Sequence, residues 1–141
     1  MTHDIEANKR VIRAFAEAIN RRDWAALDDL VAADFVRHSN AAPGIDSRDD
    51  LKRYLRNELA TFPDAHESLE DVVAEGDRVA VRHSFRGTQI GPMGPHPPSG
   101  RCMTAGYLAI YRLADGRIVE AWVEWDNLSA LVQLGHAKAD A

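Results

Sequence analysis

The fold of this chain is decided by two stretches: HESLEDVVAEGDRVAVRHSFRG at residues 66–87 and RCMTAGYLAIYRLADGRIVEAWVEWD at residues 101–126. In both, apolar and polar side chains alternate, and each is interrupted once by a short turn that contains a glycine, Gly76 or Gly116. Alternation of this length is typical of β-strands, and such a turn joins two strands as an antiparallel hairpin. We therefore predict four strands, at about residues 66–74, 78–87, 101–113 and 117–126.

The segments on either side of the hairpins have the spacing of helices instead. Apolar residues recur every three or four positions, which predicts helices at residues 5–21, 24–31 and 47–62 and a short one from Asp126 or Asn127 to about Gly135. A short extended segment is expected at residues 34–38. Helices grouped before a hairpin sheet indicate an α+β fold. We expect one domain, residues 1–141, with its core at about 8–135 and a frayed tail at 136–141.

Composition excludes several classes of function. The chain has 141 residues, of which 45% are hydrophobic, and a net charge of −5, so it can bury a core but repels phosphate backbones. We expect no nucleic acid partner. No apolar run is long enough to span a membrane, and the N-terminus lacks the order of a signal peptide. With Cys102 as the single cysteine, we expect a cytoplasmic protein.

Alternation also predicts which side chains point inward. On the strand at 78–87, Val79, Val81, His83 and Phe85 share one face, and on the last strand Val119, Ala121, Val123 and Trp125 do. The opposite face of the last strand carries Trp122 among carboxylates, which favours a surface covered by a second subunit and therefore a homodimer. Gly106, in the middle of a long strand, predicts a bend or bulge and a strongly curved sheet around an apolar pocket.

Three groups of residues carry a resemblance to a known family. They are NRRDWAALDDL (20–30) leading into DFVRH (34–38), GTQIG (87–91) followed by PPSGR (97–101), and DGRIVEAW (115–122) followed by WDNL (125–128) and QLG (133–135). With these the chain resembles the SnoaL-like polyketide cyclases, or ester cyclases, of the nuclear transport factor 2-like superfamily, which also holds ketosteroid isomerases. The resemblance covers about residues 8–135.

The resemblance implies a cone-shaped fold, three helices on a curved sheet with a pocket at the open end. It also implies cofactor-free and metal-free chemistry, in which a polar group removes a proton next to a carbonyl and a ring closes by an aldol step. Members with this chemistry are expected to carry an aspartate at Val123, a histidine at Ala121 and a second pocket histidine at Ala109. These three positions are apolar here.

We therefore place the candidate catalytic groups elsewhere. His38 ends the first strand where related isomerases carry a carboxylate, His83 points inward, and the hydroxyl of Tyr107 could polarise a carbonyl. Each also has a structural interpretation: a histidine that caps a backbone group, a core histidine, and a packed tyrosine. The predicted pocket lining is Phe15, Ile19, Phe35, Met93, Met103, Ala109, Ala121, Val123 and Trp125.

Three interpretations of function stay open. The leading hypothesis is an enzyme for aldol-type cyclisation, isomerisation or a related reaction on a small apolar carbonyl compound. The alternative is a protein that binds a hydrophobic ligand without converting it, which the apolar Val123 and Ala121 favour; a pure dimerisation domain is the third possibility. The six histidines have no metal-ligand spacing and inward carboxylates are not expected, so we predict no metal site. The Gly-Pro-rich residues 91–98 are expected to form a rim at the pocket mouth, with Met93 and His96 available to a ligand.

Overall fold

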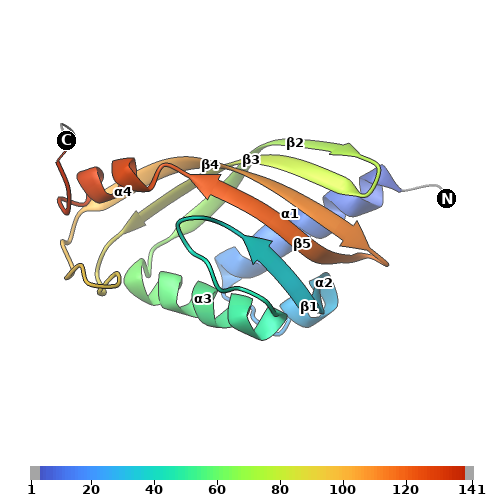
Figure 1. Ribbon diagram of the computed structural model, residues 1–141, viewed down its shortest axis with the longest axis horizontal. Helices are drawn as coiled ribbons and strands as arrows, with labels where there is room; N and C mark the ends of the chain where they lie inside the picture. The colour runs from blue at the N-terminus through green and yellow to red at the C-terminus, as the bar shows by residue number, and fades with distance from the viewer. Residues whose placement is uncertain (1–3, 139–141) are drawn as a thin grey trace.

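The computed structural model describes residues 4–138 (Figure 1). Its elements follow one another as α1 (Ile5–Arg21), α2 (Leu27–Leu30), β1 (Val31–His38), α3 (Arg48–Thr61), β2 (His66–Glu75), β3 (Arg78–Thr88), β4 (Cys102–Ala114), β5 (Arg117–Trp125) and α4 (Asn127–Gln133). The α+β fold and the two hairpins are therefore confirmed. Among residues 4–138, no helix combines the length and the hydrophobicity needed to cross a membrane.

The five strands form one curved sheet in the order β1-β5-β4-β3-β2. Strands β2 to β5 pair antiparallel, as expected from the hairpins, whereas β1 pairs with β5 in parallel. A parallel neighbour cannot be joined by a tight turn. Here the chain passes from β1 through α3, the β2–β3 hairpin and β4 before it reaches β5, and Arg37 of β1 lies opposite Ala121 of β5.

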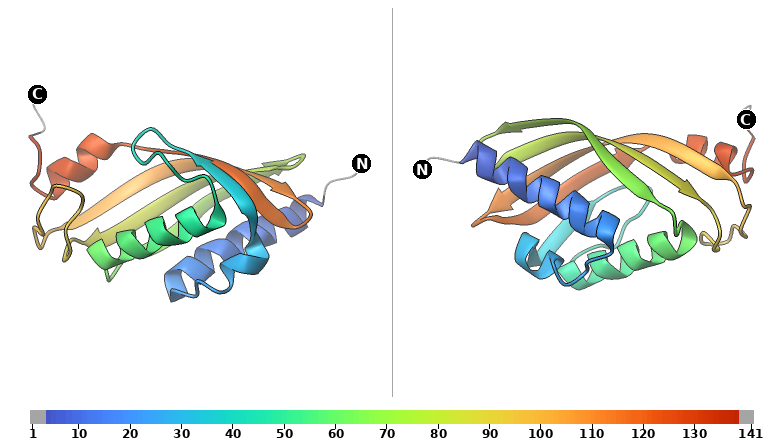
Figure 2. Two further views of the ribbon diagram at one scale, coloured as in Figure 1. Left: turned by 60° about the horizontal axis from the view of Figure 1, so that its bottom comes forward. Right: turned by 180° about the vertical axis from the view of Figure 1, so that it is seen from behind.

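Helices α1 and α3 lie on the same face of the sheet, the face toward which it curves (Figure 2). The residues that α1 buries against the sheet include Ile12, Phe15 and Ile19. Each of the three longer helices begins where a side chain satisfies a free backbone N–H: Asp4 accepts from Ala7 N, Ser47 from Asp50 N and Asp126 from Ser129 N. The start of each of these helices is therefore fixed by a capping side chain that the sequence already contains.

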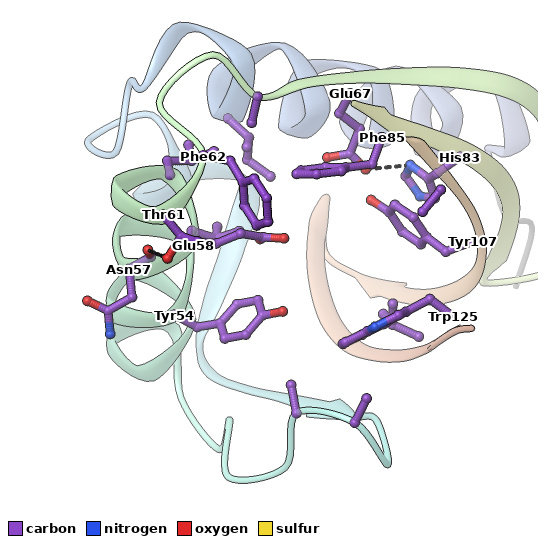
Figure 3. A pocket seen from close by; sticks show the side chains of 18 of the residues that line it. Tyr54, Asn57, Glu58, Thr61, Phe62, Glu67, His83, Phe85, Tyr107 and Trp125 are labelled. Atoms are coloured by element: carbon purple, nitrogen blue, oxygen red, sulfur yellow. Dashed lines mark hydrogen bonds and ion pairs between the residues drawn. The ribbon is translucent and has the colours of Figure 1, made fainter. Parts of the chain in front are cut away.

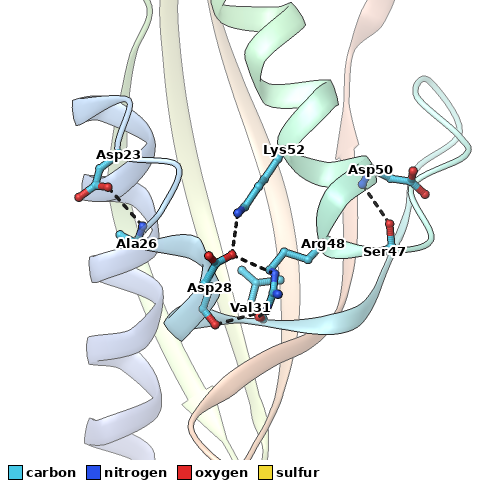
Figure 4. A network of polar contacts seen from close by, with 8 residues as sticks. All are labelled: Asp23, Ala26, Asp28, Val31, Ser47, Arg48, Asp50 and Lys52. Atoms are coloured by element: carbon cyan, nitrogen blue, oxygen red, sulfur yellow. Dashed lines mark hydrogen bonds and ion pairs between the residues drawn. The ribbon is translucent and has the colours of Figure 1, made fainter.

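Helix α2 is shorter than predicted, because residues 24–26 form a turn and the strand already begins at Val31. The Asp23 carboxylate does cap this turn by accepting from Ala26 N. Figure 4 shows how α2 holds the start of α3: the Asp28 carboxylate lies 2.6 Å from Lys52 Nζ and 3.2 Å from Arg48 Nε. The hydrogen bond from Lys52 lowers the pKa of Asp28. This network fixes α3 beside β1, with the inner face of α3 toward the sheet.

Two irregularities in the sheet change which residues point inward. In β2 the register shifts between Leu69 and Asp71, so Glu70 is an extra residue opposite β3. In β5 the register skips Val119, and as a result Ile118 is fully buried while Val119 is only half-buried. The prediction that Val119 belongs to the inner face is therefore wrong, and Ile118 is the buried residue instead. Of the bend or bulge predicted at Gly106, the bulge is absent, since β3 and β4 pair without interruption from one end to the other, while the predicted curvature of the sheet is confirmed.

Candidate functional site

A cavity of about 680 Å³ lies between the concave face of the sheet and helices α1 and α3 (Figure 3). Pockets for small organic ligands are generally ~300–1,000 Å³, so the volume suits such a molecule. Of the nine predicted lining residues, those that border the cavity are Phe15, Ile19, Phe35, Met93, Met103, Ala121, Val123 and Trp125. Ala109 is buried but does not border it, because neighbouring side chains cover it.

Helix α3 presents a carboxyl group to this cavity, that of Glu58 (Figure 3). Glu58 lies one helical turn after Tyr54 and one turn before Phe62, on the stripe that faces the sheet. Burial raises the pKa of Glu58 to about 7, and the negative charge of Glu67 adds to this effect. Near neutral pH this carboxyl group is therefore divided between its protonated and its ionised form.

The opposite wall contains a second carboxyl group, that of Glu67 in β2, which is backed by a histidine. His83 is 2% exposed, and its Nδ1 lies 2.7 Å from Glu67 Oε1. The distance allows an ion pair, although the oxygen lies off the direction of an N–H at Nδ1 and the two atoms make no aligned hydrogen bond. The other ring nitrogen, Nε2, lies 2.9 Å from the hydroxyl of Tyr111.

The tautomer of His83 follows from its partners. Burial raises the pKa of Tyr111, so its hydroxyl keeps its proton and can donate to Nε2. An ionised carboxylate can only accept, which leaves the ring proton of neutral His83 at Nδ1, facing Glu67. Tyr107 stacks on the imidazole with ring centroids 4.3 Å apart. The Nε2 of His83 is thus hydrogen-bonded to Tyr111, while its Nδ1 lies beside the Glu67 carboxylate, which borders the cavity.

At the third side of the cavity, Arg37 of β1 lies between two aromatic rings. Its guanidinium carbon is 4.6 Å from the ring centroid of Tyr54 and 5.6 Å from that of Trp125. Both distances are within the range of cation–π attraction. Burial raises the pKa of Tyr54 to about 12, so its hydroxyl stays protonated. The lining of the cavity therefore includes the carboxyl groups of Glu58 and Glu67, the guanidinium of Arg37 and the phenol of Tyr54, among many apolar side chains.

The structure places the three predicted catalytic residues differently. His83 and Tyr107 border the cavity. His38 does not: it lies on the outer face of the sheet, where its Nε2 is 2.7 Å from Glu120 Oε2 and its ring stacks on Trp122 at 5.4 Å. The hydrogen bond from His38 lowers the pKa of Glu120. The expectation that His38 acts in the pocket is therefore wrong, because it is Arg37 that shares the inward side of β1 with Phe35.

The outer neighbours of Trp122 come from its own chain. Besides His38, the guanidinium of Arg78 lies 5.0 Å from the Trp122 ring centroid. His38 and Arg78 thus cover part of the Trp122 side chain, which a second subunit was expected to cover. The homodimer remains a prediction.

Sequence reasoning missed Glu58, Glu67 and Arg37, and two of the three were accessible to it. Glu58 falls on the same helical spacing as Leu51, Leu55 and Phe62. Arg37 is two residues from the inward Phe35 on one strand. The inward direction of Glu67 depends on the bulge at Glu70, for which the sequence gives no signal. The expectation that inward carboxylates are lacking is wrong on both counts.

The Gly-Pro-rich loop borders the cavity, as residues Pro92, Met93, Gly94 and His96 line it. The loop is held by Gln89, which is fully buried and donates to the carbonyl oxygens of Gly91 and Pro97. The Gln89 amide oxygen lies 2.7 Å from His136 Nε2. In the described part of the chain, no group of three or more His, Cys, Asp and Glu side chains is arranged to hold a metal ion.

Comparison with known proteins gives a family and a set of related structures. The family model described as SnoaL-like polyketide cyclase matches residues 9–134. No sequence among the curated proteins matches the chain. Solved structures with the same fold include IdmH of Streptomyces antibioticus, a proposed polyketide cyclase, at 34% identity over 91% of this chain and 98% of that one, with a TM-score of 0.80.

Two further solved structures cover nearly all of the chain. TsrD of Streptomyces laurentii is 28% identical over 96% of this chain and 100% of that one, with a TM-score of 0.86. AclR of Streptomyces galilaeus, a proposed hydroxylase, is 26% identical over 96% and 100% of the two chains, with a TM-score of 0.84. Proteins of this shape are thus connected with more than one kind of reaction.

Proposed function

The chain belongs to the SnoaL-like polyketide cyclase family, and from this premise we propose that it is an enzyme that transfers protons on a small apolar substrate containing a carbonyl group. The reaction is an aldol-type cyclisation, an isomerisation or a related step. One observation carries the proposal: Glu58 and Glu67 face a single apolar cavity from different elements, in environments of different kind. Pairs of carboxyl groups separated in this way divide the roles of acid and base.

In this proposal Glu67 is the base. It would take a proton from the carbon next to the substrate carbonyl, and the Nδ1–H of His83 would stabilise the ionised carboxylate before the transfer. His83 is a positioning residue here, since Tyr111 occupies its other nitrogen. The hydrogen bond with Tyr111 fixes the imidazole of His83, and its Nδ1 then favours the position of the Glu67 carboxylate beside it.

Glu58 is the acid. With a pKa raised to about 7, it keeps a proton near neutral pH and can donate it to the oxygen of the enolate as the negative charge develops. The hydroxyl of Tyr107 points into the cavity beside His83 (Figure 3) and would assist at the same oxygen. This division of roles uses α3, β2 and β4, whereas the acid and base that the family resemblance implies would lie on β4 and β5.

A protein that binds a ligand without converting it is the second candidate. The apolar Val123 and Ala121 favour it, because both border the cavity where the resemblance implies an aspartate and a histidine. The two candidates make the same prediction for ligand binding and opposite ones for proton exchange.

Proton exchange is therefore the decisive measurement. Ligands found by a thermal-shift screen of aromatic polyketides, steroids and short acyl esters are incubated with the protein in D2O, and deuterium uptake next to the carbonyl is followed by NMR. We expect uptake with the wild type and a loss of ~10²–10⁴-fold in Glu67→Gln and in Glu58→Gln, the range typical of a general acid or base. Glu124→Gln, an exposed residue on the outer face, is the matched control.

Product formation in the same samples distinguishes exchange alone from a complete reaction. Tight binding with no exchange and no product would favour the binding protein. Exchange at wild-type rate in both glutamine variants would refute the roles of Glu58 and Glu67.

A further inference from the structure

Arg37 is a cation in the cavity wall that forms no ion pair with a carboxylate of the described range 4–138, and its Nη1 is enclosed and has no partner. The hydroxyl of Tyr54 is a polar neighbour, on whose pKa the guanidinium acts through its charge and a side-chain hydrogen bond. This hydroxyl is neutral and does not balance the charge of Arg37. Burying an unpaired charge is costly, and proteins normally pair such groups.

The comparison with Arg22, which also borders the cavity, makes this clear. The Arg22 guanidinium donates to three backbone carbonyl oxygens, those of Asn20 at 2.7 Å, Pro63 at 2.8 Å and Ala65 at 3.1 Å. Arg22 therefore has a structural role in joining α1 to the start of β2. The donors of Arg37 have no such acceptors.

Nor does a carboxylate of the cavity neutralise Arg37. Glu58 is near enough for its charge to interact with Arg37, yet neither Glu58 nor Glu67 forms an ion pair with it. Glu67 is directed to His83 instead. Near neutral pH Glu58 is partly protonated, so it supplies only part of a negative charge.

At this end of the cavity Arg37 lies beside two aromatic rings. The polar groups that remain there for a ligand are the N–H groups along the edge of its planar guanidinium. Tyr54 comes from α3 and Trp125 from β5, and both border the cavity together with Arg37. A guanidinium held between rings keeps a fixed plane and can donate two parallel hydrogen bonds to a pair of oxygens. Aromatic rings on either side suit a flat, conjugated ligand.

We propose that Arg37, between Tyr54 and Trp125, is a binding site for a planar group whose two oxygens share a negative charge: a carboxylate or the enolate of an acidic 1,3-dicarbonyl compound. The inference extends the proposed function, because it names the class of substrate that the same cavity takes. Anchored at Arg37, the remainder of the ligand extends toward Glu58 and Glu67, which lie on the other walls.

The test compares acids with neutral partners of nearly the same shape. The probes are 2-naphthoate with its methyl ester, and 4-hydroxy-6-methyl-2-pyranone with its 4-methyl ether. Binding is measured by calorimetry at pH 7.5 with wild type, Arg37→Met, Arg37→Lys and Arg82→Met. Arg82 is the matched control, because it lies on the outer face in an ion pair with Asp71.

We expect the wild type to bind at least one acid ~10- to 100-fold more tightly than its neutral partner, the range of a charge-assisted hydrogen-bond pair. Arg37→Met should lose this preference and keep its affinity for the neutral compound. Arg37→Lys should retain a reduced preference, since it keeps the charge without the planar fork. A preference in one pair alone assigns the site to that oxygen pair, and Arg82→Met should match the wild type.

A second readout uses the wild type alone and does not depend on the folding of a variant. An anion at Arg37 lies close to Glu58 and should raise its affinity for a proton, so binding of the acid should take up protons from the buffer between pH 6 and 8. Calorimetry in two buffers of different ionisation enthalpy measures this uptake, and the ester should show none.

Three outcomes overturn the inference: no binding of either acid at millimolar concentration, equal affinity for acid and neutral partner in both pairs, or a preference that Arg37→Met retains. Binding of the acid without proton uptake would contradict the position assigned to the anion. These results are separate from the proposed function, which is tested by proton exchange in the Glu58 and Glu67 variants.

Discussion

Replacing Glu58 by glutamine should remove a pH dependence of stability that the wild type carries. The folded-state pKa of Glu58 is about 7, above its ordinary value of 4.5, so between these values the folded chain binds a proton more readily than the unfolded chain does. In that interval stability falls as the pH rises. Below pH 4.5 the carboxyl group is protonated in both states and no penalty remains; above pH 7 it is ionised in both, and the penalty is complete.

The size of the penalty follows from the two pKa values. The difference between about 7 and 4.5, at about 1.4 kcal/mol for each pH unit, comes to about 3 kcal/mol at alkaline pH. Domains are stable by only about 5–15 kcal/mol, so this is a substantial fraction. For a domain of this length it corresponds to about 10 °C in the midpoint of thermal unfolding. Glutamine has nearly the same shape and carries no charge at any pH.

The assay is urea unfolding of wild type, Glu58→Gln and the exposed control Glu124→Gln at pH 4.5, 6, 7 and 8.5. The difference in unfolding free energy between Glu58→Gln and wild type should be small at pH 4.5 and grow to about 3 kcal/mol in favour of the variant at pH 8.5. Effects of titrating groups that do not interact with Glu58 cancel in that difference. A difference that stays constant over the whole range would show that Glu58 is not desolvated as described, and the case for it as an acid would fail with it.

Four further predictions follow from the packing. Gly91→Ala should lower stability by ~1–3 kcal/mol in urea unfolding, because the added Cβ would lie 2.7 Å from the backbone oxygen of Ala60, which cannot move freely; a neutral result would mean that the loop relaxes. Asp126→Ala should cost ~0.5–2 kcal/mol through the lost cap of α4, and Asp126→Asn, which restores the acceptor, should recover most of it. His38→Ala should leave ligand binding and proton exchange unchanged within about twofold, since His38 lies outside the cavity. A larger loss would show that His38 contributes to the function of the site. We propose a homodimer through the outer face of the sheet, where Leu108 is 63% exposed; Leu108→Lys should then yield a monomer by light scattering, and an unchanged mass would exclude this interface.

The elements that the sequence predicts well are those with local signals. Helix α3 begins at Ser47, whose hydroxyl caps it, and the two hairpins turn at Gly76 and Gly116, whose positive φ angles a glycine adopts without strain. The parallel pairing of β1 with β5 has no local signal, because the two strands are distant in the sequence.

The residues of the candidate site could be predicted where inward and outward side chains alternate regularly along the strand that carries them. On β3 the alternation holds throughout, and His83 is inward as expected. On β1 the same rule, applied from Phe35, selects Arg37 and places His38 outside. On β2 the inward and outward positions of the alternation are exchanged at the bulge. The inward direction of Glu67 therefore depends on a backbone feature for which the sequence gives no signal.

The extra residue in β2 has a consequence for how such a cavity can change over evolution. Because Glu70 offsets the two halves of the strand, Glu67 and Leu69 share the inner face with Val72 and Ala74. Loss of that single residue would leave a strand of regular alternation in which Glu67 and Leu69 still point inward. Glu70 can thus be deleted without withdrawing the Glu67 carboxylate, whereas a one-residue deletion between Glu67 and the bulge would turn Glu67 outward while the hairpin turn stayed in place.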